Sequence, residues 1–162
     1  MNMIRKFCGA ILLCSLPSIV FSFAGFLDVK ISGEVLARPC TINDGEMITV
    51  DFKDVLYNDI ENENYIKKID YSVNCKGAVN PAMRVSIKGV GTLFDDQLLK
   101  TSMDDLGVAF KAGSNRFSIK NKINFYYKNP PILYAILVKN SNGGTLPGGP
   151  FHANATLQVE YQ

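Results

Sequence analysis

The sequence FHANATLQVEYQ, residues 151–162, alternates apolar and polar side chains without exception. This period of two predicts a β-strand with one face buried and the other face in solvent. The pattern runs to the last residue, with no turn and no returning strand, although chain termini usually fray unless another segment holds them. We therefore ask which segment pairs with this strand. Its apolar side chains occupy the odd positions: Phe151, Ala153, Ala155, Leu157, Val159 and Tyr161.

The first 24 residues are expected to be a secretory signal peptide. Arg5 and Lys6 precede an apolar stretch at 7–20, and residues 22–24 form a small-x-small cleavage site. A membrane anchor is the alternative, which the short apolar stretch disfavours because a spanning helix needs about 20 apolar residues. Residues 25–162 then have a length typical of one domain.

The charge of the exported part is balanced. The chain has 17 Lys and Arg and 15 Asp and Glu, and residues 1–24 contain two of the basic residues and none of the acidic ones. Residues 25–162 thus carry equal numbers of basic and acidic side chains. Nucleic-acid binding requires a clustered surplus of Lys and Arg, so we expect no nucleic-acid partner.

Cys40 and Cys75 are the two cysteines that remain after residue 24. A single pair in an exported protein is expected to form a disulfide, which would stabilise the fold by roughly 3–4 kcal/mol on the chain-entropy model. A metal site or a thiol nucleophile is the alternative. Two sulfurs with one distant histidine, His152, make a poor zinc site, so we expect no metal and no cofactor.

Strand patterns dominate the rest of the chain, and no long stretch has helical periodicity. About seven short strands separated by turn signals are typical of an antiparallel β-sandwich. Two regions are ambiguous: residues 53–64 fit a loop or one helical turn, and residues 116–127 fit a further short strand. The expected strands lie at 27–35, 47–52, 66–75, 83–89, 106–111, 132–139 and 151–161.

Both ends of this sandwich carry amphipathic strands, which is unusual. An exposed apolar edge strand is normally avoided because it recruits other chains. A protein that keeps two such ends is expected to use them.

GEVLARPCTINDGEMITVDFKDV, residues 33–55, resembles the opening of chaperone–usher pilus subunits of Gram-negative bacteria. The shared features are a Gly-x-Val, a Pro-Cys-Thr-Ile-Asn segment and a short Val-Asp-Phe strand. A second cysteine follows about 35 residues later, a glycine (Gly149) lies 14 positions from the end, and the penultimate residue is aromatic. The resemblance covers residues 25–162, and it is greatest to the minor, adaptor subunits of the pilus tip.

The resemblance implies an all-β fold: an incomplete immunoglobulin-like β-sandwich that lacks its C-terminal strand and is completed by a donor strand from another chain. The implied partners are a periplasmic pilus chaperone, an outer-membrane usher and neighbouring pilus subunits. The chain would be exported through the periplasm and assembled on the cell surface in a fimbrium, where it contributes to adhesion. Pilin strand donation is an established example of strand addition, in which main-chain hydrogen bonds supply affinity and alternate side chains supply specificity.

The resemblance also implies the site residues and the domain boundaries. Residues 25–38 would be the donor-strand extension, and residues 39–162 would be the pilin domain. The inward-facing donor residues would be Leu27, Val29, Ile31, Gly33 and Val35. The chaperone-binding and acceptor edge would comprise Gly149, Leu157, Val159, Tyr161 and Gln162, with the terminal carboxylate held by basic residues of the chaperone.

Gly33 is informative because a glycine inside a strand usually weakens it or marks a close backbone approach. In this family, a glycine at that place in the donor strand fits a shallow pocket of the acceptor. A bulge, or simple tolerance of glycine, is the alternative.

Catalytic and metal-binding chemistry has little support. His152 lies on the polar face of the last strand, and no Ser-His-Asp arrangement can be built from it. The acidic pairs at 95–96 and 104–105 fall near turns, where solvated loops explain them better than calcium binding. The Gly-rich segment 143–149 lacks the lysine and the following helix of a phosphate loop.

We therefore predict a non-enzymatic, structural pilus subunit. The alternative is a single-domain secreted lectin-like adhesin that binds a host receptor, and a small secreted hydrolase is more remote because no nucleophile–base pair is present. The absence of tryptophan disfavours the lectin. A self-sufficient module should fold alone, whereas a pilin should not.

Overall fold

The structure is a computed structural model that describes residues 25–34, 40–75, 82–143 and 147–162. The expected signal peptide at 1–24 and the donor residue Val35 lie outside the described residues. The chain divides into a unit that ends at Glu34 and a unit from Val35 to Gln162. The second unit contains all ten strands of the described part of the chain, and these form antiparallel sheets, which confirms the all-β prediction.

The first sheet has three strands in the order β10-β4-β8. The strands are β10 (Thr156–Tyr161), β4 (Ala82–Lys88) and β8 (Lys122–Tyr126). The apolar positions of β10 and β4 are directly opposite each other, since Leu157 faces Ile87 and Val159 faces Val85. This register places both apolar sets on one face of the sheet, as a period of two requires.

The second sheet has five strands, with β2, β9, β6 and β5 side by side and β7 paired to β6. A separate two-stranded sheet joins β1 to β3. Two short 3-10 turns, η1 and η2, follow β1. The bounds are β1 (Thr41–Ile42), η1 (Asn43–Gly45), η2 (Tyr57–Asp59), β2 (Ile66–Ile69), β3 (Val73–Asn74), β5 (Leu99–Lys100), β6 (Leu106–Ala112), β7 (Asn115–Phe117) and β9 (Leu133–Lys139).

The core lies between the two large sheets and is built from alternate residues of each long strand. Strand β4 contributes Met83, Val85 and Ile87, all almost completely buried. Alternate residues of β6 and β9 are buried in the same cluster, with Val108 directly opposite Leu137. A sandwich stabilised by two such inner faces is the architecture that alternation predicts.

A disulfide joins Cys40 to Cys75, across a sequence separation of 35 residues. Cys40 precedes β1 and Cys75 follows β3, so the bridge fastens the ladder in which Thr41 pairs with Asn74. The predicted disulfide is therefore confirmed.

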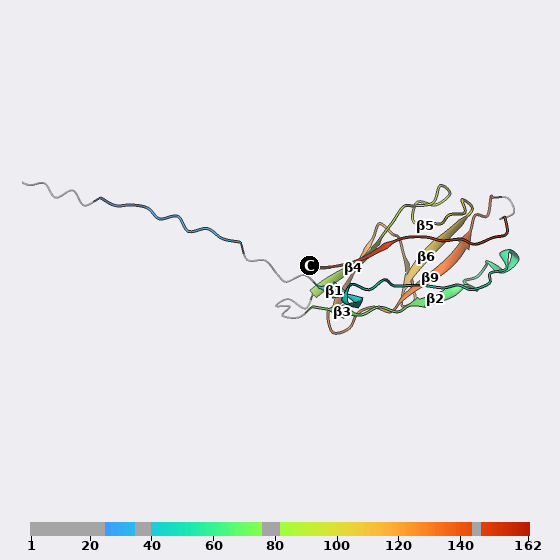
Figure 1. Cartoon of the computed structure of the whole chain (residues 1–162), viewed down its shortest axis with the longest axis horizontal. Helices are drawn as coiled ribbons and strands as arrows, with labels where there is room; N and C mark the ends of the chain where they lie inside the picture. The colour runs from blue at the N-terminus through green and yellow to red at the C-terminus, as the bar shows by residue number, and fades with distance from the viewer. Residues whose placement is uncertain (1–24, 35–39, 76–81, 144–146) are drawn as a thin grey trace, which may run out of the picture. The chain divides into compact units, whose positions relative to one another are not determined.

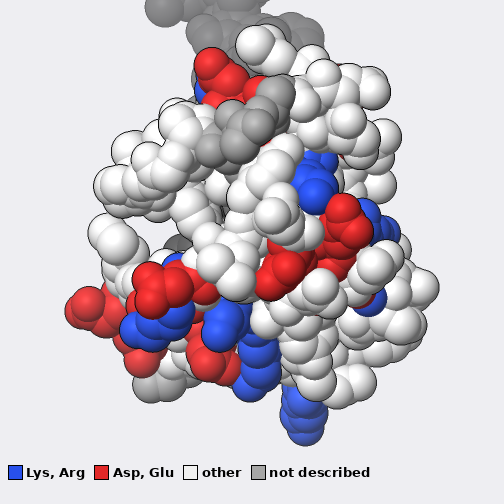
Figure 2. Space-filling model, turned by 90° about the vertical axis from the view of Figure 1, so that its right-hand side faces the viewer, with Lys and Arg blue, Asp and Glu red and all other residues white. Residues whose placement is uncertain are grey.

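The second sheet is also covered on its outer face. Ile136 is completely buried there, in a small cluster with Leu98 and Ala109. The loop that contains Glu61 and Glu63 is tied to this sheet by ion pairs with Lys139 (2.9 Å), Lys111 (2.7 Å) and Arg116 (3.1 Å). Figure 2 shows that acidic and basic side chains are interspersed on the face it displays, as the balanced charge predicts.

Several predicted strands differ from the observed ones. Residues 47–52 and 151–155 carry no secondary structure, and neither do residues 25–34. The expected strand at 66–75 is interrupted between β2 and β3, and residues 116–127 contain the end of β7 and all of β8. A ladder needs a neighbouring strand as well as a suitable sequence, and residues 47–52 have no neighbouring strand in the described part of the chain.

Within the described residues, no helix has the length and hydrophobicity needed to cross a membrane.

Candidate functional site

The first side of the candidate site is residues 46–52, which we call the first lip. It follows η1, where Asn43, Asp44 and Gly45 have φ values of 49°, 52° and 93°. Such left-handed conformations are costly for non-glycine residues, although asparagine and aspartate adopt them most readily. Asn43 is anchored to Ser72: its N–H donates to the Ser72 carbonyl (3.0 Å), and its side-chain oxygen accepts from the Ser72 N–H (3.1 Å).

This turn directs the first lip away from the β1–β3 ladder. Within the described part of the chain, residues 47–52 make no backbone hydrogen bond to any strand. Their backbone N–H and C=O groups are therefore available to pair with an added strand. Because such groups are rarely left without a partner in folded proteins, a partner strand is expected here.

The first lip ends in a tight local turn. Lys53 has a left-handed φ of 59°, and its N–H donates to a carboxylate oxygen of Asp51 (2.8 Å). The Lys53 ammonium also contacts Asp51 at 2.6 Å, and this hydrogen bond lowers the pKa of the exposed Asp51 carboxyl. The turn fixes where the lip leaves the sandwich.

The second side of the site is residues 151–157, which we call the second lip. It comprises the approach to β10 and the first residues of that strand. His152 is tied to Ser102, whose N–H donates to the His152 carbonyl (2.8 Å) and whose hydroxyl accepts from the His152 N–H (3.1 Å). Among the described strands, β10 pairs only with β4, so no described strand lies along its other edge. An unpaired apolar edge is a template for another strand.

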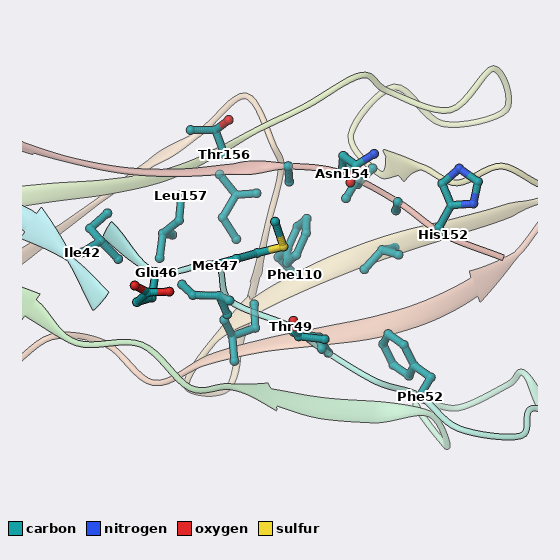
Figure 3. Close-up of a pocket in the computed structure, with 18 of the residues that line it drawn as sticks. Ile42, Glu46, Met47, Thr49, Phe52, Phe110, His152, Asn154, Thr156 and Leu157 are labelled. Atoms are coloured by element: carbon teal, nitrogen blue, oxygen red, sulfur yellow. The ribbon is translucent and has the colours of Figure 1, made fainter. Parts of the chain in front are cut away.

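An apolar groove of about 590 Å³ separates the two lips. Val108 and Phe110 of β6 contribute to its floor, and Ile42 and Leu157 line one end. Figure 3 shows the arrangement: Met47, Thr49 and Phe52 follow one lip, His152, Asn154 and Thr156 follow the other, and Phe110 lies between them. Met47 is 88% exposed although it lines an apolar groove.

A second cavity, of about 620 Å³, adjoins the groove at the start of the second lip. It is lined by Gly149, Phe151 and Ile60, among others, and it shares Phe52 with the first cavity. In Figure 1 the red C-terminal segment and the teal segment that follows β1 run along the domain, with β6 and β9 seen between them. The two cavities share Phe52 and are lined in turn by successive residues of 149–157, so we treat them as one trough, which suits a strand better than a compact ligand.

Two of the five residues predicted for the acceptor edge line this trough. Leu157 lines the groove, and Gly149 lines the adjoining cavity. Val159 and Tyr161 pack against the core from the same face of β10. Gln162 continues the pairing with β4, since its N–H donates to the Ala82 carbonyl (3.1 Å) and its side-chain amide donates to the Met83 carbonyl (2.8 Å).

The opposite face of β10 is polar. Glu160 forms a hydrogen-bonded ion pair with Lys122 of β8 and a second ion pair with Arg84 of β4 (3.4 Å). The Lys122 hydrogen bond holds the pKa of the Glu160 carboxyl below its ordinary value. These pairs support the sheet from its solvent side and leave the groove apolar.

Three of the predicted donor residues in the first unit have large apolar side chains that are exposed. Leu27, Val29 and Ile31 are 88%, 76% and 91% exposed, and a Cβ added at Gly33 would meet no heavy atom within 4 Å. Soluble proteins rarely present such a continuous apolar row unless it has a binding role.

Sequence reasoning missed the first lip as part of the site. Met47, Phe52 and Phe110 line the groove, but they were assigned only to expected strands or left without a role. The sequence signal for the first lip was the short β-rich run at 47–52. This run predicts a strand, but it does not tell whether the strand has a neighbour.

The site is suited to binding a strand. Two unpaired backbone edges flank an apolar floor, which is the arrangement that strand addition uses. Among the described residues, no group of three or more His, Cys, Asp or Glu side chains is placed to hold a metal ion.

Comparison with known proteins agrees with this geometry. The family described as "Fimbrial protein" matches residues 29–162. The fimbrial-like protein YfcQ of Escherichia coli strain K12 is 30% identical over 144 residues, which cover 83% of this chain and 87% of YfcQ.

Two solved pilus subunits have a similar fold. The P pilus adaptor subunit PapF gives a TM-score of 0.55 at 21% identity, covering 80% of this chain and 100% of PapF. The P pilus rod subunit PapA gives a TM-score of 0.60 at 18% identity, covering 83% of this chain and 99% of PapA. These similarities confirm the predicted immunoglobulin-like sandwich.

Proposed function

This chain belongs to the fimbrial protein family and is a structural subunit of a pilus, and we propose that it joins the fibre by donor-strand exchange. In this mechanism the trough accepts a strand from another protein, and residues 25–38 supply a strand to a neighbouring subunit. The observation that carries the proposal is the pair of facing lips, between which none of the described strands lies.

The acceptor half of the mechanism follows from backbone chemistry. A strand placed between residues 46–52 and residues 151–157 would hydrogen-bond to both lips and join the two sheets at that edge. Its inward side chains would cover Met47, Leu157 and the floor formed by Phe110. The gain is the burial of apolar surface on both partners.

The donor half rests on the exposed extension. Leu27, Val29 and Ile31 share one parity with Gly33 and Val35 in the sequence, so all five would face one side of an added strand. Their apolar surface has no covering partner among the described residues of the first unit. An acceptor trough on a neighbouring subunit would bury it.

The same trough would be occupied by two partners in succession. A periplasmic chaperone would occupy the β10 edge first, through Leu157, Val159, Tyr161 and Gln162, and a neighbouring subunit would replace it at the outer-membrane usher. The chain is exported and assembled on the cell surface in a fimbrium. We infer no catalytic role, because its contribution to the fibre is structural.

The test uses a grafted chain: residues 25–162, a short flexible linker, and a second copy of residues 25–37 after Gln162. We expect the ungrafted chain to aggregate or be degraded when it is expressed without a chaperone. The grafted chain should be a stable monomer with a cooperative thermal transition. A linker followed by the same residues in scrambled order is the control. An ungrafted monomer whose melting temperature equals that of the grafted chain would refute the proposal.

A further inference from the structure

The loop between β4 and β5, residues 89–98, presents two exposed apolar side chains. Val90 is 71% exposed and Leu93 is 89% exposed. Phe94 has the opposite orientation, because it is half-buried and packs against the outer cluster of the second sheet that contains Leu98. Phe94 therefore anchors the loop, and Leu93 projects from it into solvent.

Hydrogen bonds within the loop hold Leu93 in this position. The Thr92 hydroxyl donates to the Asp95 carbonyl (2.7 Å) and accepts from the Asp95 N–H (3.0 Å). The Thr92 N–H donates to the Leu98 carbonyl (3.1 Å). At Gly91 the backbone approaches closely, since an added Cβ would lie 2.8 Å from the Asp96 carbonyl oxygen. A side chain presented by a pre-ordered loop can dock with little further loss of conformational entropy.

The loop lies at the end of the trough where the second lip begins. A Cβ added at Gly89 would lie 3.4 Å from the Asn154 carbonyl oxygen. Figure 1 shows β5, which follows the loop, at the opposite end of the domain from β1, β3 and the C-terminus. All the ladders between the described strands are antiparallel, and antiparallel pairing is slightly the more stable form. A strand added antiparallel to β10 would leave the trough at this end.

The chain that follows the added strand is short. In a donating subunit with this sequence, Val35 is the last inward-facing residue of the extension, and Cys40 directly precedes β1. Five residue steps span at most about 18 Å when fully extended. The β1–β3 end of the donating domain must therefore lie within that distance of the trough, beside residues 89–98 of the acceptor.

The β1–β3 end carries an apolar surface of its own. A cavity of about 680 Å³ is lined there by Phe117, Tyr126 and Ile132, among others. Tyr126 is 69% exposed and Ile132 is 52% exposed. The Tyr71 hydroxyl, two residues before β3, donates to the carbonyl of Pro131, which also lines this cavity (2.5 Å). The domain thus has exposed apolar side chains at both of its ends.

We propose that Val90 and Leu93 dock on the β1–β3 end of the domain whose strand fills the trough, as a second contact between consecutive subunits. The occupant is a pilin domain with aromatic and aliphatic side chains at that end, as a second copy of this chain has in Tyr126 and Ile132. This inference rests on the proposed function and adds a surface to it. The added strand acts as a tether that raises the effective concentration of the two domains to about the millimolar range, so even a small apolar contact forms.

The test assembles a dimer of defined order by refolding two chains together. The donor is the grafted chain, whose own trough is filled. The acceptor lacks residues 25–34 and cannot donate, although it keeps the unit that contains all ten described strands. Leu93→Cys in the acceptor should form an intermolecular disulfide with Ile132→Cys or Tyr126→Cys in the donor, because docking brings the two positions into bonding range.

The matched control exchanges the two substitutions between the partners. Ile132→Cys in the acceptor and Leu93→Cys in the donor then lie at the far ends of the dimer and should not be trapped. Absence of trapping at both donor positions would overturn the second contact. Equal trapping in the two arrangements would overturn it as well, because the disulfide would then form by random encounter.

Release of the donor gives the second readout. Leu93→Ser in the acceptor should speed release of the whole-domain donor by roughly tenfold or more, as expected when the burial of one leucine is lost. Release of a peptide of residues 25–37 should be unchanged, because the peptide carries no domain. Equal effects on domain and peptide would overturn the inference. Failure of the proposed function is a different result, in which the acceptor binds neither the donor nor the peptide.

Discussion

The loss of stability caused by Ile31→Ala in the grafted strand measures how far the side chain of this donor residue is buried in the trough. In the extension Ile31 is 91% exposed, so almost all of its side chain would be newly buried in the trough. The substitution removes three carbon atoms, which is a transfer loss of about 2.4 kcal/mol at roughly 0.8 kcal/mol per group. Incomplete relaxation around the space raises the expected cost to about 2–4 kcal/mol.

The assay is thermal unfolding of the grafted chain, followed by circular dichroism. For a domain of this size the cost corresponds to a fall in melting temperature of roughly 7–15 °C. Lys30→Ala in the grafted strand is the first control. Lys30 and Ile31 point to opposite faces of a strand, so Lys30 faces solvent when Ile31 faces the trough, and its loss should change stability by less than about 0.5 kcal/mol. Ile31→Ala in the native extension of the same protein is the second control and should have no effect.

Two results would refute this reasoning. Equal losses for Ile31→Ala and Lys30→Ala would show that the strand has no defined inward face, since a slip of one residue exchanges the two faces. An equal loss from Ile31→Ala in the native extension would show that this extension, and not the graft, occupies the trough.

Three further predictions concern the domain itself, all measured in the grafted chain. Replacing Cys40 and Cys75 by serine should lower the free energy of unfolding in denaturant by about 3–4 kcal/mol, as expected for a 35-residue separation; thiol labelling of the unmodified protein would contradict it. Ile136→Ala should cost about 2–5 kcal/mol, because Ile136 is completely buried, and a cost below about 0.5 kcal/mol, which is typical of surface substitutions, would contradict that burial. Hydrogen bonding from Lys111 lowers the pKa of Glu63 below its ordinary 4.5. The ionised Glu63 carboxylate therefore contributes its full stabilisation of the folded state above pH 4.5, and this stabilisation is lost as the pH falls through the lowered pKa. Glu63→Gln should therefore flatten the dependence of melting temperature on pH below about 4.5. An unchanged pH profile would show that the Glu63–Lys111 ion pair does not cause the loss of stability in acid.

The alternation of apolar residues was enough to predict the long strands. Residues 83–89, 106–111 and 132–139 were expected to be strands, and alternate side chains of the observed strands β4, β6 and β9 form the core. This worked because side-chain direction along a strand depends only on local backbone geometry, which repeats every two residues.

Short ladders and unpaired segments were not predictable in this way. Strands β1 and β5 contain two residues each, too few to show a period. Residues 47–52 have the composition of a strand, yet they form the first lip. Composition reports how well a residue suits a pleated surface, and it does not report whether a neighbouring strand is present.

Some residues of the candidate site were predicted from the sequence, and others were found only in the structure. Gly149 and Leu157 were predicted from the resemblance, and both line the trough. The contact between Phe52 and Phe151 joins residues about 100 positions apart in the sequence, and no local pattern marks it. The resemblance supplied one edge of the site, and the geometry supplied the other.

Side-chain alternation was enough to predict which face of each long strand is apolar, and the cysteine count was enough to predict that the only two cysteines after residue 24 are paired. Only the folded chain shows which edges remain unpaired among the described strands, and that Phe52 and Phe151 meet. The physical reason is that side-chain alternation is a property of one segment, whereas backbone pairing and groove depth depend on segments that meet only when the chain folds.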